Sequence, residues 1–320
     1  MYGVGCYSLI QVVGLIFWYS GCFLAAMVKK GLVELTQEHS FRLTVACPDA
    51  VGIVAAMSSF IAEAGGLITE SNHYCEPESK WFFARQVIAV NSLPYSLDEL
   101  RRRFDAIARK FSMQWQVVET RLPKKVVLMV SKQAHCLSDL LYRWRSGEMP
   151  ANITAVISNH EDLRDYVEWH KLPYHYVPIV DGNKEAHFKK VADLLEGIDP
   201  DVVVLARYMQ VMPPDLCERF AGKLINIHHS FLPAFAGAKP YHQAAKRGVK
   251  LIGATCHYVT EDLDAGPIID QDITRISHHD TLQDMARKGK DIEKVVLARG
   301  LRFHLEDRVL IHGNKTIVFE

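Results

Sequence analysis

Three short runs of aliphatic residues, with almost no polar residue among them, constrain the fold of this chain more than any other feature of its sequence. They are VVLMVS (126–131), ITAVIS (153–158) and VVVLAR (202–207). Strands that are apolar on both faces are typical of a parallel sheet with helices on each side. Helical patterns separate the runs, and this alternation predicts an α/β fold with a Rossmann-like, mostly parallel sheet. The expected helices cover 136–144, 163–170, 187–195 and 292–305, and a further short strand covers 174–177.

Residues 41–121 follow another pattern, with strands and helices in the order β-α-β-β-α-β that defines a ferredoxin-like unit. We expect strands near Leu43 and Val45 and over 67–74, 81–90 and 115–120, and helices from Pro48 or Asp49 to about Ala64 and over 97–111. With its motif C-P-D-A-V-G-I-V, this segment resembles an ACT domain, a regulatory module that often binds amino acids. The resemblance implies an amino-acid effector, and the alternative is a packing or dimerisation module without a ligand.

Residues 1–28 carry no charged side chain before Lys29 and Lys30 appear, and this apolar stretch is long enough to span a bilayer. If it were inserted, the two lysines would keep its C-terminal side in the cytoplasm. The interpretation that we favour is a start at Met27, because everything after residue 28 has the pattern of a soluble, cytoplasmic protein. The segment 1–40 is therefore treated as an N-terminal extension that precedes two domains.

The chain has 37 basic and 37 acidic side chains, so its formal net charge is zero. A duplex-binding protein needs a basic excess to displace counterions from phosphates, so nucleic acid is not expected as a partner. The seven cysteines are odd in number and form no C-x-x-C pair, which argues against a disulfide framework and a zinc site. The histidine doublets are poor chelates because neighbouring strand residues point to opposite faces, so we predict no metal.

The residues that point most directly to chemistry lie in and after the stretch K-L-I-N-I-H-H-S-F-L-P, which begins at Lys223. Asn226 and His228 are two apart on an expected short strand, so their side chains share one face. Asp264 precedes the tripeptide A-G-P, which places it on a tight loop. Taken one at a time, each residue has an ordinary alternative role as a satisfied structural group or a turn cap.

Two motifs together resemble the formyltransferase family that uses 10-formyltetrahydrofolate: N-x-H-x-S-x-L-P-x-x-x-G from Asn226, and D-L-D-x-G-P-I-I-x-Q from Asp262. The resemblance implies that Asn226, His228 and Asp264 are catalytic, and that 10-formyltetrahydrofolate is the substrate with no further cofactor. It also implies that the stretch L-A-R-Y-M-Q-V-M and a facing loop border the pterin. The candidates for folate binding are then Arg207, Met209, Val211, Met212, Thr260 and Asp262. His229 and His135 are second-rank candidates, and packing is the alternative role of His229.

Two features point to one branch of this family. The chain has V-S-K-Q-A-H-C-L-S-D-L-L where glycinamide ribonucleotide formyltransferases carry a glycine-rich phosphate loop, and an ACT-like segment precedes the catalytic domain at 122–320. Over residues 41–320 the chain closely resembles the formyltetrahydrofolate deformylases. The resemblance implies hydrolysis of 10-formyltetrahydrofolate to formate and tetrahydrofolate, which balances one-carbon folate pools and supplies formate for purine biosynthesis.

Two other functions remain open from the sequence. One is a formyltransferase that moves the formyl group to an amine, and the other is a catalytically idle sensor that binds folate and an amino acid. We expect the segment K-P-Y-H (239–242), together with His135, to close the acceptor side so that only water reaches the formyl group. A homo-oligomer is also expected, because ACT-like modules commonly pair.

Overall fold

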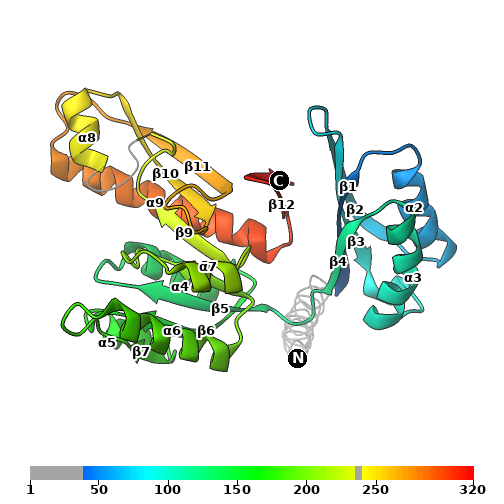
Figure 1. The fold of residues 1–320 in the computed structure, drawn as a ribbon, viewed down its shortest axis with the longest axis horizontal. Helices are drawn as coiled ribbons and strands as arrows, with labels where there is room; N and C mark the ends of the chain where they lie inside the picture. Colours follow the sequence, from blue (N-terminus) through cyan, green and yellow to red (C-terminus); the bar gives the residue numbers. More distant parts are fainter. Residues whose placement is uncertain (1–38, 235–239) are drawn as a thin grey trace, which may run out of the picture.

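The computed structural model describes residues 39–234 and 240–320, which form two units joined near residue 122 (Figure 1). The apolar segment 1–28 and Lys239 lie outside the described residues, so the predictions made for them stay predictions. Within the described ranges, no helix has both the length and the apolar composition that a membrane crossing requires.

The N-terminal unit is a four-stranded antiparallel sheet with two helices on one of its faces (Figure 1). Its strands, in the spatial order β2-β3-β1-β4, are β1 (Ser40–Pro48), β2 (Ile68–Glu76), β3 (Trp81–Ala89) and β4 (Gln114–Glu119). The helices are α2 (Ile53–Glu63) and α3 (Leu97–Lys110), and a short 3₁₀ turn covers Val90–Ser92. The core between sheet and helices is closed, since Leu43, Met57 and Phe104 are each 1% exposed.

The first helix begins later than the sequence pattern predicts. α2 starts at Ile53 and not at Pro48 or Asp49, because β1 extends to Pro48 and the Asp49 N–H donates to the Lys80 carbonyl at 2.8 Å. Gly52 then turns the chain in the left-handed region (φ 95°) that favours glycine. The turn before this helix therefore stays attached to the β2–β3 hairpin.

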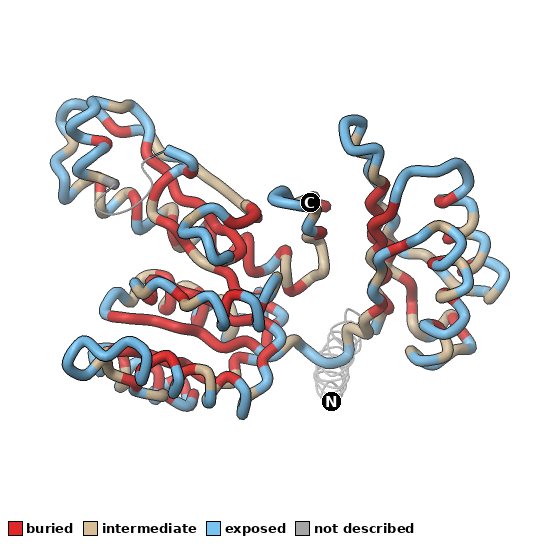
Figure 2. The backbone as a smooth tube through the Cα atoms, viewed as in Figure 1, coloured by how far each residue is buried: buried red, intermediate tan, exposed pale blue. Residues whose placement is uncertain are grey.

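The second unit contains a seven-stranded sheet with the strand order β11-β10-β9-β8-β5-β6-β7. In chain order, its strands are β5 (Lys124–Val130), β6 (Ala151–Ser158), β7 (Tyr174–Tyr176), β8 (Val202–Leu205), β9 (Leu224–His228), β10 (Leu251–Tyr258) and β11 (Ile268–Arg275). The first five are parallel, which confirms the mostly parallel sheet that the apolar runs predict, whereas β10 pairs antiparallel with both neighbours. The runs form the centre of the sheet, where Val126, Val156 and Val204 are completely buried (Figure 2).

Helices cover both faces of this sheet, with one core beneath α4 and α9 and another beneath α6 and α7. They are α4 (His135–Ser146), α5 (Arg164–Trp169), α6 (Lys184–Ile198), α7 (Pro214–Arg219), α8 (Pro240–Arg247) and α9 (Leu282–Leu305). The last helix is longer than the predicted 292–305 segment. Thr281 and Asp284 form a capping box, and this start signal begins α9 at Leu282.

The two units pack together through the face of the N-terminal sheet that carries no helices (Figure 1). The last residues of the chain form a hairpin of β12 (Val309–His312) and β13 (Lys315–Val318). Leu310 and Phe319 from this end of the chain make an apolar contact with Ala46 and Phe83 of the sheet. Beside it, three cations donate to the last carbonyl oxygens of α9: Lys124 to His304 (2.9 Å), Arg42 to Leu305 (3.1 Å) and Arg85 to Glu306 (3.0 Å). Cations stabilise a helix C-terminus, so α9 is anchored at the interface between the units.

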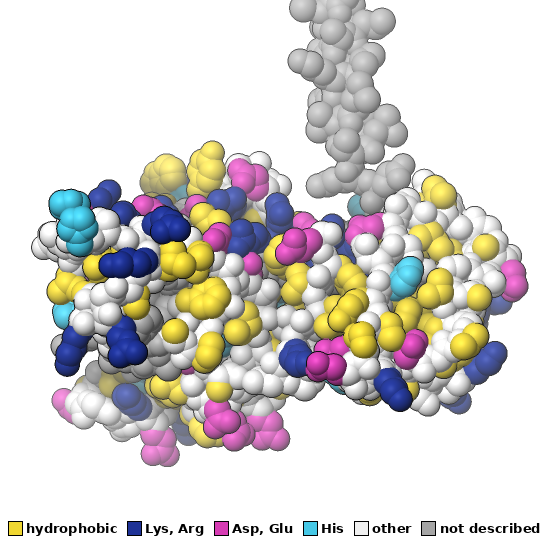
Figure 3. All heavy atoms as spheres, turned by 90° about the horizontal axis from the view of Figure 1, so that it is seen from above, with side chains coloured by type: hydrophobic (Ala, Val, Ile, Leu, Met, Phe, Trp, Pro, Cys, Tyr) yellow, Lys and Arg dark blue, Asp and Glu magenta, His cyan; other side chains and the backbone are white. Residues whose placement is uncertain are grey.

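Basic and acidic side chains are interspersed over the face of the molecule that Figure 3 shows. Among the described residues drawn there, neither sign of charge forms a continuous field. A surface that binds a polyanion would instead gather its cations on one face or stripe.

Candidate active site

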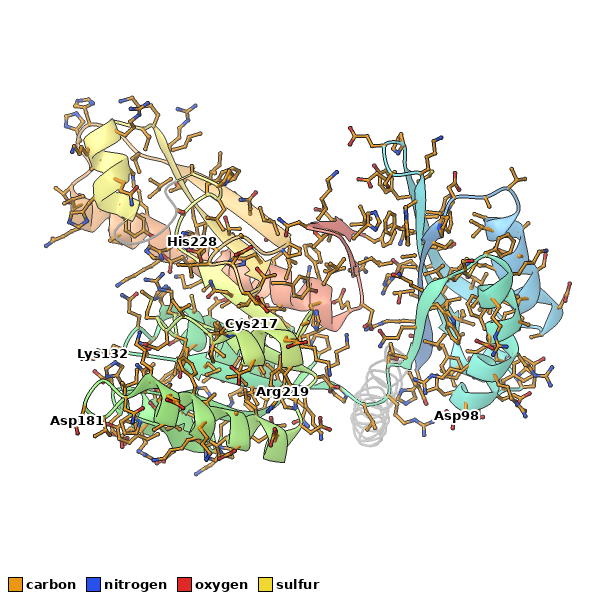
Figure 4. The ribbon with its side chains drawn as sticks, viewed as in Figure 1. Asp98, Lys132, Asp181, Cys217, Arg219 and His228 are labelled. Carbon is orange, nitrogen blue, oxygen red and sulfur yellow. The ribbon has the colours of Figure 1, made fainter. Side chains whose placement is uncertain are left out.

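The candidate site lies at the carboxyl ends of the neighbouring parallel strands β8 and β9, the edge at which open α/β sheets bind ligands. Asn226 lies within β9, and His228, which Figure 4 labels, is its last residue. Their side chains share one face of the strand, as the two-residue spacing predicts. The loop between β10 and β11 brings Asp264 to the same place.

A histidine of the neighbouring strand orients the amide of Asn226. The register pairs Asn226 with His257 of β10, and Asn226 Nδ2 lies 3.2 Å from His257 Nε2. His257 Nδ1 lies 2.8 Å from the Tyr258 carbonyl oxygen, which can only accept, so Nδ1 carries the proton and Nε2 accepts from Asn226. Burial lowers the pKa of His257, which keeps this ring neutral. One N–H of the amide is thus engaged, and the other is left for a ligand.

His228 and Asp264 form the central pair of the site. His228 Nδ1 lies 3.2 Å from Asp264 Oδ1, and the two side chains are only 5% and 9% exposed. Burial raises the pKa of the Asp264 carboxyl, but the hydrogen bond from His228 outweighs it, so the pKa lies below its usual 3.8. The other ring nitrogen, His228 Nε2, is buried without a hydrogen-bond partner among the described residues. A bound substrate or water would satisfy it.

A strained loop holds Asp264 in place. Its backbone lies in the left-handed region (φ 56°), which residues other than glycine rarely adopt and which is common at functional sites. A Cβ at Gly266 would lie 1.9 Å from the Tyr258 carbonyl oxygen, so only glycine lets the loop approach the end of β10 this closely. Thr260 Oγ1 donates to the Asp262 carbonyl at 3.1 Å and closes the turn that precedes Asp264.

The loop after β8 forms a second wall of the site and is strained in the same way. Arg207 (φ 67°) and Met209 (φ 60°) both have left-handed backbones, and the buried Tyr208 lies between them. Tyr208 is held at both ends, because its phenol oxygen lies 2.5 Å from His187 Nε2 and its carbonyl accepts a hydrogen bond from Ser131. Met209, the residue after this anchored tyrosine, is 58% exposed and borders the site.

These elements enclose a cavity of about 410 Å³, and Asn226, His228 and Asp264 line it together. The structure therefore brings the three predicted catalytic residues to one place. A concave site of this size with a few convergent polar groups is typical of small-molecule binding. The remaining lining residues are Leu205, Arg207, Tyr208, Met209, Gln210, Val211, Ile227, His229 and Leu263.

The predicted folate-binding residues do not all border this cavity. Arg207, Met209 and Val211 line it, whereas Met212 is 4% exposed and lines a neighbouring groove of about 650 Å³. Thr260 and Asp262 are not among its described lining residues, and their loop contributes Leu263 and Asp264 instead.

The two second-rank histidines lie in different surroundings. His229 lines the cavity, and its ring centroid is 5.1 Å from that of His228. Burial and the charge of Arg207 lower the pKa of His229 to about 4, so this ring is neutral near pH 7. His135 is not among the lining residues, and its Nε2 lies 2.8 Å from Glu293 Oε2.

One group of described side chains has the spacing of metal ligands. His135, Cys136 and Glu293 place three potential ligand atoms within 4.8 Å of one another. Arg207 Nε, however, lies 3.4 Å from the same Glu293 oxygen that contacts His135, and burial raises the pKa of the Cys136 thiol. The carboxylate is already paired with a cation, which argues against a divalent metal ion at this group.

His257 and Glu293 contact the site but were not among the predicted residues. The contact of His257 with Asn226 follows from the β9–β10 register, which the sequence does not show. Glu293 had a visible signal, because it is the one charged residue among the buried positions of α9, four residues after Gly289 and eight after Met285. A buried carboxylate on a helix is rarely left unpaired.

Comparison with known proteins gives the family. Residues 124–301 match the family model described as formyl transferase. A formyltetrahydrofolate deformylase of Bacillus subtilis (strain 168) is 48% identical over 283 residues, which are 88% of this chain and 94% of that protein. The crystal structure of a formyltetrahydrofolate deformylase from Pseudomonas syringae pv. tomato str. DC3000 matches with a TM-score of 0.89 at 55% identity, over 93% of this chain and 100% of that one. The chain therefore belongs to the formyltetrahydrofolate deformylase family.

Proposed function

We propose that the chain hydrolyses 10-formyltetrahydrofolate to formate and tetrahydrofolate. The observation that carries this proposal is the shared cavity of Asn226, His228 and Asp264 in a member of the deformylase family. The reaction balances one-carbon folate pools and supplies formate for purine biosynthesis. It needs only the substrate and water, so no further cofactor is proposed.

In the proposed reaction, water attacks the formyl carbon, and negative charge develops on the formyl oxygen of the tetrahedral intermediate. The second N–H of Asn226 and a protonated Nε2 of His228 donate hydrogen bonds to that oxygen. Donors that are already oriented toward developing charge are strongly stabilising, and losing one typically costs about 10² to 10³ in turnover. The contact between Asn226 and His257 supports this role, because it holds the amide in one orientation.

Asp264 is proposed to orient His228 and to move a proton. Its Oδ1 accepts from His228 Nδ1, which stabilises the protonated ring. The carboxylate also takes a proton from the attacking water, and this proton passes to N10 as the C–N10 bond breaks. A new C–O bond thus replaces the C–N bond, the second proton of the water is lost to solvent from formic acid, and formate and tetrahydrofolate leave. A positioned acid or base contributes about 10² to 10⁴ to the rate.

The pterin is proposed to lie against the loop after β8, beside Arg207, Met209 and Val211. Met212 is buried beneath this loop and packs against it. Thr260 and Asp262 hold the turn of the facing loop through the hydrogen bond between them. Val211 also lines the neighbouring groove, which offers a path for the rest of the folate.

The N-terminal unit, residues 41–121, is proposed to be an ACT-like regulatory domain for the catalytic domain at 122–320. Its β-α-β-β-α-β order is that of a ferredoxin-like unit, and its sheet contacts the end of α9. An amino acid is the proposed effector, and the proposed form is a cytoplasmic homo-oligomer.

The activity is tested with purified protein, 10-formyltetrahydrofolate and no amine. Formate and tetrahydrofolate should appear in equal amounts. Asn226→Ala should slow formate release by about 10² to 10³, whereas Asn152→Ala, which changes an exposed asparagine of β6, should leave it unchanged. Equal rates in both variants would remove Asn226 from the catalytic assignment.

A further inference from the structure

Glu293 of α9 is 1% exposed and joins four parts of the catalytic unit. Its Oε2 contacts His135 Nε2 of α4 at 2.8 Å and, as an ion pair, Arg207 Nε of the β8 loop at 3.4 Å. Its Oε1 accepts from the Tyr241 hydroxyl of α8 at 2.8 Å. Burial raises the pKa of Glu293, but the hydrogen bond from His135 and the charge of Arg207 outweigh it and lower the pKa to about 2.

These contacts lie between two cavities. The catalytic cavity is lined by Arg207, while a second, mainly apolar cavity of about 340 Å³ is lined by Tyr241. Among the described residues, His229 is the one that lines both, and its ring centroid is 6.0 Å from that of Tyr241. Glu293 contacts Arg207 through one carboxylate oxygen and Tyr241 through the other. Together with His229, these two side chains therefore form a partition that separates the two cavities.

The surface of α9 is shaped to receive Tyr241. A Cβ at Gly289 would lie 1.9 Å from Tyr241 Oη and 2.5 Å from Cζ. Gly289 comes one helical turn before Glu293, so the missing side chain makes the room through which the tyrosine reaches the carboxylate. The partition thus depends on two independent features of one helix.

We propose that Glu293 is a positioning residue that fixes Tyr241 and Arg207 as a partition, and that this partition keeps amine nucleophiles away from the formyl group while water reaches it. The inference rests on the proposed hydrolysis and deepens it, because it names what makes water the acceptor. In a variant with a displaced partition, an amine attacks the formyl carbon and the C–N10 bond breaks. N10 takes the proton that the amine loses, and the products are a formylated amine and tetrahydrofolate.

The test measures the ratio of formylated amine to formate when 10-formyltetrahydrofolate and glycinamide are supplied together. Tyr241→Phe removes the hydrogen bond to Glu293 but keeps the ring, and Gly289→Ala displaces the ring. Both variants should raise the ratio by about tenfold or more over the unaltered protein, the scale on which a small change in pocket size alters discrimination. The matched controls, Tyr142→Phe on the exposed face of α4 and Gly197→Ala on α6, should leave the ratio unchanged.

The ratio separates a positioning role from a structural one. A variant that is merely less stable loses both products in proportion, so a ratio equal to that of the unaltered protein in both Tyr241→Phe and Gly289→Ala overturns the inference. The proposed hydrolysis fails in a different way, because the unaltered protein would then release no formate with or without glycinamide, and would form tetrahydrofolate and formylated amine only when glycinamide is present.

Discussion

His228 Nδ1 lies 3.2 Å from Asp264 Oδ1, while His228 Nε2 is buried without a partner among the described residues. The ring is therefore held at one nitrogen and available at the other, which is the arrangement that an acid or hydrogen-bond donor needs. Asn226 adds a second donor on the same strand face, and its orientation is set by His257.

Asp264→Asn should lower kcat by about 10² to 10⁴, because the amide neither stabilises a protonated His228 nor accepts a proton from water. The pKa of Asp264 is lowered, so this carboxylate stays ionised at any pH above its usual 3.8, and its protonation does not contribute to changes in activity between pH 5 and 8. The dependence of kcat on pH checks both points. Asp165→Asn, which changes an exposed aspartate of α5, is the control, and equal kcat in the two variants would contradict the role.

His229, which is half-buried, should make the protein less stable in acid. Its pKa is lowered to about 4, whereas a histidine in the unfolded chain titrates near 6.5, so the unfolded state binds more protons between these values. The contribution of neutral His229 to the free energy of unfolding is fully present above pH 6.5, and it should fall by about 3 kcal/mol as the pH approaches 4. Urea unfolding at a series of pH values measures the slope of the free energy of unfolding against pH. His229→Gln should reduce it and the exposed His278→Gln should not, and equal slopes in both would contradict the account.

Replacing glycine by alanine should change the free energy of unfolding in opposite directions at two helical positions. At Gly300 of α9 an added Cβ would lie 2.5 Å from Cys256 Sγ, and crowding of this buried contact should cost about 1 to 3 kcal/mol. At Gly197 of α6 nothing lies within 4 Å, so alanine should add about 0.5 to 1 kcal/mol through helix propensity. The free energy of unfolding, measured in urea, checks the pair. A change of the same sign at both positions would contradict the packing of α9 on β10.

Arg85→Ala should weaken the contact between the two units. The Arg85 side chain is 2% exposed, ion-pairs with Glu70 at 2.8 Å and donates to the Glu306 carbonyl at the end of α9. Losing hydrogen bonds of a charged group should lower the free energy of unfolding by about 2 to 3 kcal/mol. Arg102, 77% exposed and paired with Glu99, provides the control, because its replacement by Ala should cost about 1 kcal/mol or less. Similar losses in both variants would argue against a buried interface.

The fold was predictable where one local pattern decides it. The three aliphatic runs indicated a sheet that is buried on both faces, and Val126, Val156 and Val204 have no exposed surface. Helix starts were less predictable, because they depend on what the preceding residues contact. The bond from Asp49 to Lys80 delays α2, and the capping box of Thr281 extends α9 toward its N-terminus.

The site was predictable to the extent that its residues share a strand or a motif. Asn226 and His228 share a face by their spacing alone, and the motif added Asp264. His257 depends on the register between two strands, and Glu293 is brought to Arg207 and Tyr241 only by the packing of α9. Such contacts between distant segments have no signature in a single sequence.

Hydrolysis in water enriched in ¹⁸O tests the central claim most directly, because it identifies the atom that attacks the formyl carbon. Purified protein turns over 10-formyltetrahydrofolate without any amine, and the released formate is analysed by mass spectrometry. We predict formate that carries one oxygen from the solvent, formed at a rate that falls in Asn226→Ala and Asp264→Asn. Turnover that begins only after an amine is added, with the formyl group recovered on that amine, would contradict the account.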